Sequence, residues 1–355
     1  MCGKCAITVN GLIRPAEMGI TLPHEHLLID FSCRYVAAAD EGELSAQQPA
    51  LADRWRLLRT PAGYKVNLEG TDLDQSAAEA LWFKKSGGRT IVDLTGVGLG
   101  ADASGLKEVA DRSGVNVIAA TGLYIDASLP DWVREASTEE LAQHLVDDIM
   151  RGGREGIRRG AIGEIAIETA TDLELKCLRA AARAQSRTSA PCFLHVMSGI
   201  LPSFRPLTDE LIAIYLEEGG EIDKLVLCHQ DGSGDDLAYQ ERLLARGLWL
   251  EYDTFGSEGV FAFGEAYIQL PTDTQRIAEL ATLIERGHIG QLLISQDVCY
   301  QTGKRNWGGH GLAHILDSLA PRFRAAGIGQ DRLTNLMVDN PARLLCFAAE
   351  NASAG

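Results

Sequence analysis

Apolar residues along the chain gather in short runs rich in Val, Ile and Leu, and longer mixed segments separate these runs. Each run is shorter than an ordinary helix, which favours a buried strand. The pattern predicts eight strands, at residues 21–29, 90–95, 115–121, 160–165, 190–196, 224–229, 248–253 and 291–297. The intervals between them predict helices at residues 76–86, 106–113, 132–154, 173–185, 207–218, 237–246 and 274–286.

This alternation predicts a parallel sheet, because each return of the chain to the same edge needs a crossover that a helix usually provides. Eight units in one series predict an α/β fold of the (β/α)8 TIM barrel type. A doubly wound open sheet is the alternative. That fold usually carries a glycine-rich phosphate loop after its first strand, whereas histidines lie near the end of the first run here.

No linker, internal repeat or low-complexity tract divides the series, so residues 1–355 are expected to form a single domain. Within it, residues 1–18 are expected to hold a short β-hairpin turning at Asn10-Gly11, residues 19–347 the barrel, and residues 348–355 a tail. The polar segment 31–73 is expected as a long loop. It either walls a substrate pocket or forms a surface excursion.

Charge, apolar content and cysteine spacing indicate which binding partners and which cellular compartment to expect. The formal net charge is -16 at pH 7, which argues against nucleic acid or an anionic membrane surface as a partner. No apolar run reaches the ~20 residues that span a bilayer, and the first twenty residues lack a signal-peptide pattern. A cytoplasmic protein is therefore expected. Its eight scattered cysteines suit reduced thiols, and Cys2-Gly3-Lys4-Cys5 has no second pair to complete a zinc site.

The candidate chemistry lies where the predicted strands end. His24 and His26 are one residue apart, so a strand would direct both side chains to one face. Such a pair also occurs in ordinary strands and is weak evidence alone. In a barrel, however, the carboxyl ends of all strands meet at the active site. Six residues would converge there: His24, His26, Glu164, His195, His229 and Asp297.

Four imidazoles and two carboxylates can hold two divalent ions about 3.5–4 Å apart, and Glu164 is the expected bridge between them. Zinc is expected first, although manganese, cobalt or iron also suits these ligands. A hydroxide shared by the ions would be a nucleophile near neutral pH. Asp297 is expected to accept its proton and pass it to the leaving group.

Six short motifs occur in this order along the chain: Thr21-Leu22-Pro23-His24-Glu25-His26, Ile162-Gly163-Glu164-Ile165, Leu194-His195, Cys228-His229-Gln230-Asp231, Glu251-Tyr252-Asp253 and Ser295-Gln296-Asp297. With them, residues 11–347 resemble the phosphotriesterase family of the amidohydrolase superfamily. The resemblance implies that His24, His26 and Asp297 bind a buried metal, and that His195 and His229 bind an exposed one. It also suggests a homodimer.

Two positions depart from the pattern of efficient phosphotriesterases. Glu164 stands where they carry a carboxylated lysine, and Thr254 stands where they carry a proton-relaying histidine. Residues 304–316 resemble the phosphotriesterase-related (parathion hydrolase-related) branch, which uses a bridging glutamate and includes hydrolases of N-acyl amino sulfonates. The resemblance therefore favours acyl substrates over phosphotriesters.

Three further residues are expected to bind a small-molecule substrate. Tyr124 would face the mouth of the barrel, and Lys304 and Arg305 would present cations to an anionic group there, unless their loop is merely solvated. The expected function is a metal-dependent hydrolase of a small carboxylic ester, lactone or amide. A phosphotriesterase and a barrel that binds a ligand without catalysis are the alternatives.

Overall fold

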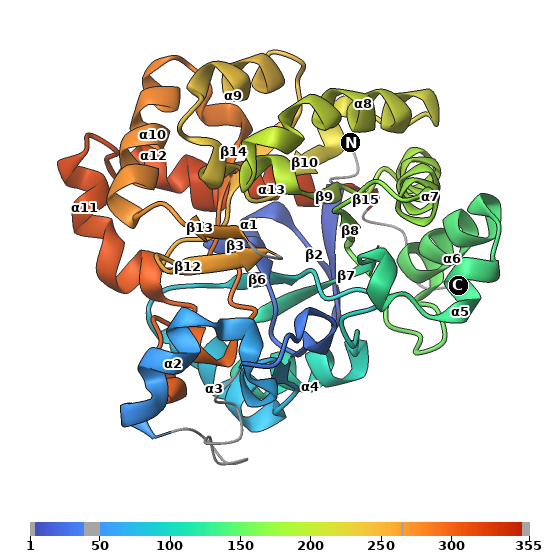
Figure 1. Cartoon of the computed structure of the whole chain (residues 1–355). Helices are drawn as coiled ribbons and strands as arrows, with labels where there is room; N and C mark the ends of the chain where they lie inside the picture. Colours follow the sequence, from blue (N-terminus) through green and yellow to red (C-terminus); the bar gives the residue numbers. More distant parts are fainter. Residues whose placement is uncertain (1–3, 39–49, 264–265, 350–355) are drawn as a thin grey trace.

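The computed structural model describes residues 4–38, 50–263 and 266–349, and through them strands alternate with helices (Figure 1). Eight strands form one parallel sheet, in the order in which they occur along the chain. They are β3 Thr21–Glu25, β6 Thr90–Asp93, β7 Asn116–Leu123, β8 Ala161–Ile167, β9 Cys192–Val196, β10 Leu225–Leu227, β11 Trp249–Tyr252 and β14 Leu292–Ile294. Each predicted strand therefore coincides with one of these.

The two edge strands of this sheet, β3 and β14, lie against each other and close it. The Oγ of Ser295 donates to the carbonyl oxygen of His24 at 2.8 Å and accepts from the His24 N–H at 3.2 Å. The N–H of Asp297 donates to the same carbonyl at 3.3 Å. The predicted TIM barrel is thus confirmed, and the open-sheet alternative is excluded.

Helices cover the outside of the barrel: α3 Leu73–Lys85, α4 Ala103–Ser113, α6 Thr138–Arg151, α7 Asp172–Thr188, α8 Arg205–Glu217, α9 Leu237–Leu244, α10 Asp273–Glu285, α11 Ala320–Ala325, α12 Gln330–Thr334 and α13 Asn340–Leu345. The single helix expected at 132–154 is instead two, because α5 Asp131–Glu135 ends before Ser137. Ser137 Oγ accepts from the Glu140 N–H, and Glu140 accepts from the Ser137 N–H, so a new helix begins there.

Side chains of the barrel strands alternate between two apolar clusters, as the two-residue period of a strand requires. One cluster fills the interior and includes Val92, Ile118, Phe193, Val226 and Leu293. The other joins the strands to the helices and includes Ile91, Val117, Leu194, Leu227 and Ile294. Since the interior is packed with apolar side chains, polar chemistry is left to the ends of the strands.

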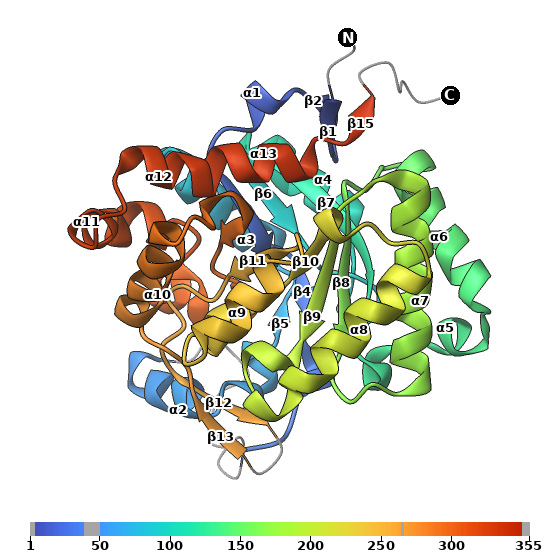
Figure 2. The ribbon, with the colours of Figure 1, turned by 90° about the horizontal axis from the view of Figure 1, so that it is seen from above.

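Short elements close the amino-terminal end of the barrel. The strands β1 Lys4–Thr8 and β2 Gly11–Ile13 form the expected hairpin, and β15 Ala348–Ala349 pairs with β1, so the expected tail begins as a strand. With α1 Pro15–Met18 and α13 they lie at one end, opposite α2 Arg54–Arg59 and the hairpin of β12 Val260–Phe263 and β13 Ala266–Gln269 (Figure 2). Cys2 and residues 350–355 lie outside the described part.

The expected loop 31–73 contains α2 and several single turns. Its ends are tied together by β4 Ile29–Asp30, which pairs with β5 Glu69–Gly70. Residues 39–49 of this loop lie outside the described part. Within the described ranges, no helix combines the length and the apolar character needed to cross a bilayer.

Candidate metal centre

Glu164 lies at the centre of the six residues that the sequence predicts as ligands. Its Oε1 is 3.5 Å from His24 Nε2, 3.4 Å from His229 Nε2 and 3.2 Å from His195 Nδ1. Its Oε2 is 3.6 Å from His26 Nε2. One carboxylate therefore faces four imidazoles from three segments of the barrel, since His24 and His26 both come from β3 and its end. This is the arrangement expected of a bridging ligand.

Asp297 completes the cluster from the end of β14. Its Oδ1 lies 3.3 Å from His26 Nε2 and 3.8 Å from His24 Nε2, and its Oδ2 lies 3.9 Å from His229 Nδ1. The structure thus brings together all six predicted ligands. Both Asp297 and His229 have left-handed backbones, with φ of 46° and 60°. Non-glycine residues rarely adopt this conformation, and such strain is concentrated at functional sites.

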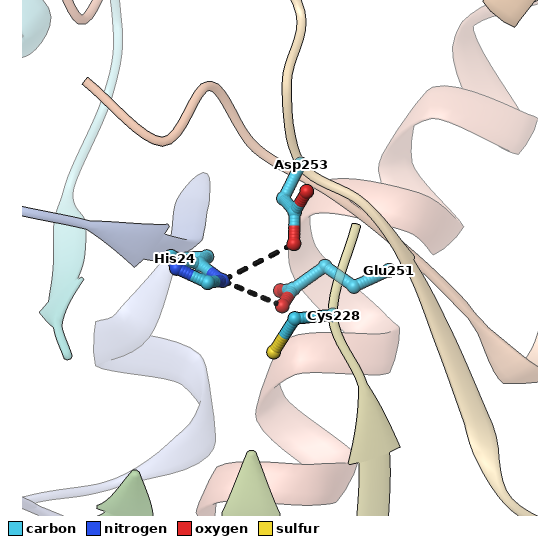
Figure 3. A group of neighbouring side chains, drawn as sticks. All are labelled: His24, Cys228, Glu251 and Asp253. Atoms are coloured by element: carbon cyan, nitrogen blue, oxygen red, sulfur yellow. Dashed lines mark hydrogen bonds and ion pairs between the residues drawn. The ribbon is translucent and has the colours of Figure 1, made fainter. Parts of the chain in front are cut away.

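A second layer of polar groups fixes the rings of three histidines. His24 Nδ1 lies 3.0 Å from Glu251 Oε2 and 3.2 Å from Asp253 Oδ2, which approach it from β11 and its end (Figure 3). His229 Nδ1 lies 3.0 Å from Asp253 Oδ1, and His26 Nδ1 lies 2.9 Å from Thr95 Oγ1. Each ring therefore turns its Nε2 toward Glu164. Histidines that bind metals are usually held in this way at the other nitrogen.

Cys228 also lies beside His24, and with Glu251 and Asp253 these four residues are close enough to hold an ion (Figure 3). We interpret this group as the support of His24, because its Nδ1 is already bonded to the two carboxylates. Burial also raises the pKa of the Cys228 thiol well above its usual value. Since the thiolate is the form that binds metals, this cysteine is a poor ligand.

Buried polar atoms that lack a hydrogen-bond partner show whether the cluster suits metal ions. His24 Nε2, His195 Nε2 and Asp297 Oδ1 are buried and have no hydrogen-bond partner within the described ranges. A buried polar atom without a partner is costly, so these atoms are suited to a ligand. Three overlapping groups could each hold an ion: His24, His26 and Glu164; His24, His229 and Asp297; and Glu164, His195 and His229. The residues fit a metal centre.

Electrostatics also favour cations here. Burial alone would raise the pKa of Glu164, but hydrogen bonds with His195 and His229 hold it well below the usual value. For Asp253 and Asp297, the neighbouring imidazoles likewise outweigh burial and lower the pKa. These three carboxylates are therefore charged at neutral pH and are suited to bind cations.

The cluster forms the floor of a cavity with apolar walls, which include Phe31, Met197, Ile200, Leu270 and Tyr300. Tyr124 lines this cavity as the sequence predicts, and its ring centroid lies 5.5 Å from that of His195. A small molecule that enters the cavity would thus contact the carboxylates and imidazoles at its floor and apolar side chains at its walls.

The structure does not bring Lys304 and Arg305 to this cavity, which corrects the expected cationic mouth. The Arg305 N–H donates to Glu79 on α3 at 2.5 Å, and this bond draws the segment toward the outer helices. The Arg305 guanidinium pairs with Asp317 at 2.5 Å and lies 4.0 Å from the centroid of the Trp82 ring. Lys304 is only 3% exposed.

Among the described residues that line the cavity, the one lysine or arginine is Arg34, which no motif in the sequence marks. Its Nη2 donates to the Tyr124 hydroxyl at 2.8 Å, and its Nη1 pairs with Glu168. It belongs to the loop that was expected to wall a pocket. Several arginines occur in that loop, however, and no periodicity distinguishes the one that turns inward.

Known proteins resemble this chain over nearly its whole length. The chain matches the model of the phosphotriesterase family over residues 5–345. A phosphotriesterase-related protein of Nematostella vectensis is 32% identical over 354 residues, covering 98% of this chain and 100% of the relative. The N-acetyltaurine hydrolase of Danio rerio is 34% identical over 345 residues, covering 96% of this chain and 97% of that protein.

Among solved structures, a resiniferatoxin-binding protein from Rhodobacter sphaeroides superposes with a TM-score of 0.90 at 32% identity. The match covers 98% of this chain and 96% of that one. The family match and these relatives each extend over nearly the whole chain, and so include every strand that carries a predicted ligand. The chain therefore belongs to the phosphotriesterase family.

Proposed function

We propose that this protein is a hydrolase that holds two divalent metal ions, with zinc the first candidate, and cleaves a carboxylic amide, ester or lactone. The observation that carries the proposal is the position of Glu164, whose two oxygens lie 3.2–3.6 Å from ring nitrogens of four histidines. His24, His26 and Asp297 would hold one ion, and His195 and His229 the other.

Divalent ions bound there would supply an activated water and would polarise the acyl oxygen of the substrate. The residues of the chain supply the proton transfers. Asp297, with its Oδ1 unpartnered within the described ranges, is placed to take a proton from the attacking water and deliver it to the leaving group. The Tyr124 hydroxyl accepts from Arg34, so its own proton is free to donate to substrate.

Two observations support an acyl substrate over a phosphotriester. Thr254 contacts Asp231, and the guanidinium of Arg276 donates to both, at 2.7 and 2.6 Å. This position therefore holds a half-buried hydroxyl that is fixed by an arginine, and not an imidazole that could relay protons. The N-acetyltaurine hydrolases among the relatives are named for cleaving an N-acyl compound, which supports an amide as the first substrate to test.

The test is hydrolysis by protein freed of metal with a chelator and then loaded with zinc, manganese or cobalt. The substrates are N-acetyl amino acids, N-acetyl amino sulfonates, simple esters, lactones and phosphotriesters. We expect metal-dependent turnover of an acyl substrate, and we expect His24→Ala to abolish it. His144→Ala is the control and should retain turnover, because the His144 ring lies on α6 beside Trp132. Turnover of phosphotriesters alone would contradict the proposal.

A second candidate is a barrel that binds a ligand without cleaving it. It is favoured by the name of the solved protein from Rhodobacter sphaeroides and by the apolar walls of the cavity. The same assay separates the two candidates. Saturating metal content with no turnover of any substrate would support the binding protein, whereas product formation would exclude it.

A further inference from the structure

Arg34 is the sole lysine or arginine among the described residues that line the cavity above the metal centre. The cavity otherwise combines carboxylates, imidazoles and apolar walls. A fixed positive charge among such walls can pair with an anionic group on a small ligand. The placement of this one guanidinium therefore bears directly on which molecules the cavity accepts.

The guanidinium is held in a defined orientation. Nη1 pairs with Glu168 and Nη2 donates to the Tyr124 hydroxyl. Its Cζ lies 5.3 Å from the centroid of the Tyr124 ring and 5.8 Å from that of Phe31, so the plane is supported by two aromatic rings. An orientation fixed in advance reduces the entropy lost when a ligand binds.

The contacts of Arg34 leave part of its hydrogen-bonding capacity unused. A guanidinium has five N–H groups, and the two bonds above use only part of them. Its Nε is buried and has no hydrogen-bond partner among the residues that the structure describes. The side chain is 14% exposed, so a ligand rather than bulk solvent is the natural partner of the remaining donors.

The route from this cation to the reaction centre is short. The Tyr124 hydroxyl contacts Arg34, and the Tyr124 ring lies 5.5 Å from the His195 ring, centroid to centroid. A ligand that places its acyl group at the imidazoles can thus reach Arg34 with an anionic oxygen group on a short spacer. Carboxylates and sulfonates both have the oxygen geometry that a guanidinium binds through parallel bonds.

We propose that Arg34 binds the anionic group of the substrate and so directs the enzyme to short N-acyl amino acids or amino sulfonates. This inference rests on the proposed acyl hydrolysis, and it replaces Lys304 and Arg305 as the source of anion recognition. Glu168 and Tyr124 orient the guanidinium, while Arg34 itself touches the substrate.

The kinetic test compares three N-acetyl substrates of similar length: N-acetyltaurine with a sulfonate, N-acetyl-β-alanine with a carboxylate, and uncharged N-acetylethanolamine. Arg34→Gln is expected to lower kcat/KM about 10- to 100-fold on whichever anions the wild type cleaves, since charged hydrogen bonds are lost. We expect a change below about 3-fold on the uncharged compound. Arg305→Gln, which removes a cation outside the cavity, serves as the matched control.

A purely structural role for Arg34 predicts a different result, namely an equal loss on all three substrates. That outcome would overturn the inference, as would unchanged kinetics on the anions. Arg34→Lys keeps the charge but loses the planar donors, so it is expected to recover only part of the activity on anions. Thermal melting and metal content, measured for each variant, identify any that fold poorly.

A binding measurement keeps this inference separate from the proposed function. Ethanesulfonate and propionate are titrated into metal-loaded wild type and Arg34→Gln protein by calorimetry. If the wild type cleaves no acyl substrate yet binds either anion at least about 10-fold more tightly than the variant does, the proposed function fails and the anion site stands. If the wild type binds neither anion, or binds both as tightly as the variant does, the anion site is excluded.

Discussion

The Oε1 of Glu164 lies 3.2 Å from the Nδ1 of His195, whereas the three other histidines face this carboxylate through Nε2. The difference follows from their supports. His24, His26 and His229 are each held at Nδ1 by a carboxylate or a hydroxyl, so Nε2 is the nitrogen left for an ion. The geometry therefore assigns Nε2 as the ligand atom of His24, His26 and His229.

Asp253 supports two of these rings, since it contacts Nδ1 of both His24 and His229. Asp253→Asn is expected to weaken metal binding by about 10- to 100-fold, because the amide cannot accept as strongly or hold both rings in one tautomer. Competition with a coloured chelator measures this affinity. Asp235→Asn, at an exposed carboxylate paired with Arg205, is the control. Equal affinity in both variants would show that the rings need no such support.

Glu25 ties the end of β3 to the segment that carries Asp297. Its carboxyl group accepts from the Gln296 N–H at 2.9 Å and from the Val298 N–H at 3.0 Å, and it lies 2.8 Å from Ser295 Oγ. Glu25→Gln places an amide that can donate among these donors. We expect kcat to fall by about 10-fold or more as Asp297 shifts. Steady-state kinetics and a crystal structure of the variant check this, and an unmoved Asp297 with full kcat would disprove it.

Lys304 is buried, and its Nζ has no hydrogen-bond partner within the described residues. Burial lowers its pKa to about 8, whereas an unfolded chain keeps the ammonium to about pH 10. Between these values the unfolded state binds more protons, so stability rises with pH through that window. Lys304→Met is expected to remove this rise and to add up to about 3 kcal/mol of stability at pH 7.

Urea unfolding of wild type and Lys304→Met at several pH values measures this effect. The same variant should keep wild-type kcat/KM on anionic substrates, because its side chain lies outside the cavity. A selective loss on anions would instead restore the substrate-binding role expected from the sequence.

The barrel and the meeting of the six candidate ligands at its mouth could be predicted because both depend on local patterns. Apolar runs of strand length identify the strands, and His195 and Glu164 occupy strand positions that any closed barrel brings together. Glu251 and Asp253 can also be recognised in the sequence, as two carboxylates that lie two residues apart near the end of a predicted strand. In the sequence they stand out only as a motif shared with the family, and their contact with His24 is visible only in the structure.

The cation at the cavity could not be predicted, because its position depends on how loops fold. Arg34 turns inward only because Tyr124 and Glu168 lie where its donors can reach them. Arg305 is held outside by Glu79, which lies 226 residues away in the sequence, and by Asp317. Composition and periodicity carry no information on such distant pairings.

Metal content measured together with turnover decides whether Glu164 bridges two ions. Wild type and Glu164→Gln are saturated with zinc, freed of loosely bound metal and analysed by mass spectrometry. If Glu164 is the bridge, the wild type holds two zinc ions per chain and hydrolyses an acyl substrate, whereas the variant holds at most one ion and hydrolyses none. Two ions retained by the variant, or full wild-type turnover with a single ion, would contradict this role of Glu164.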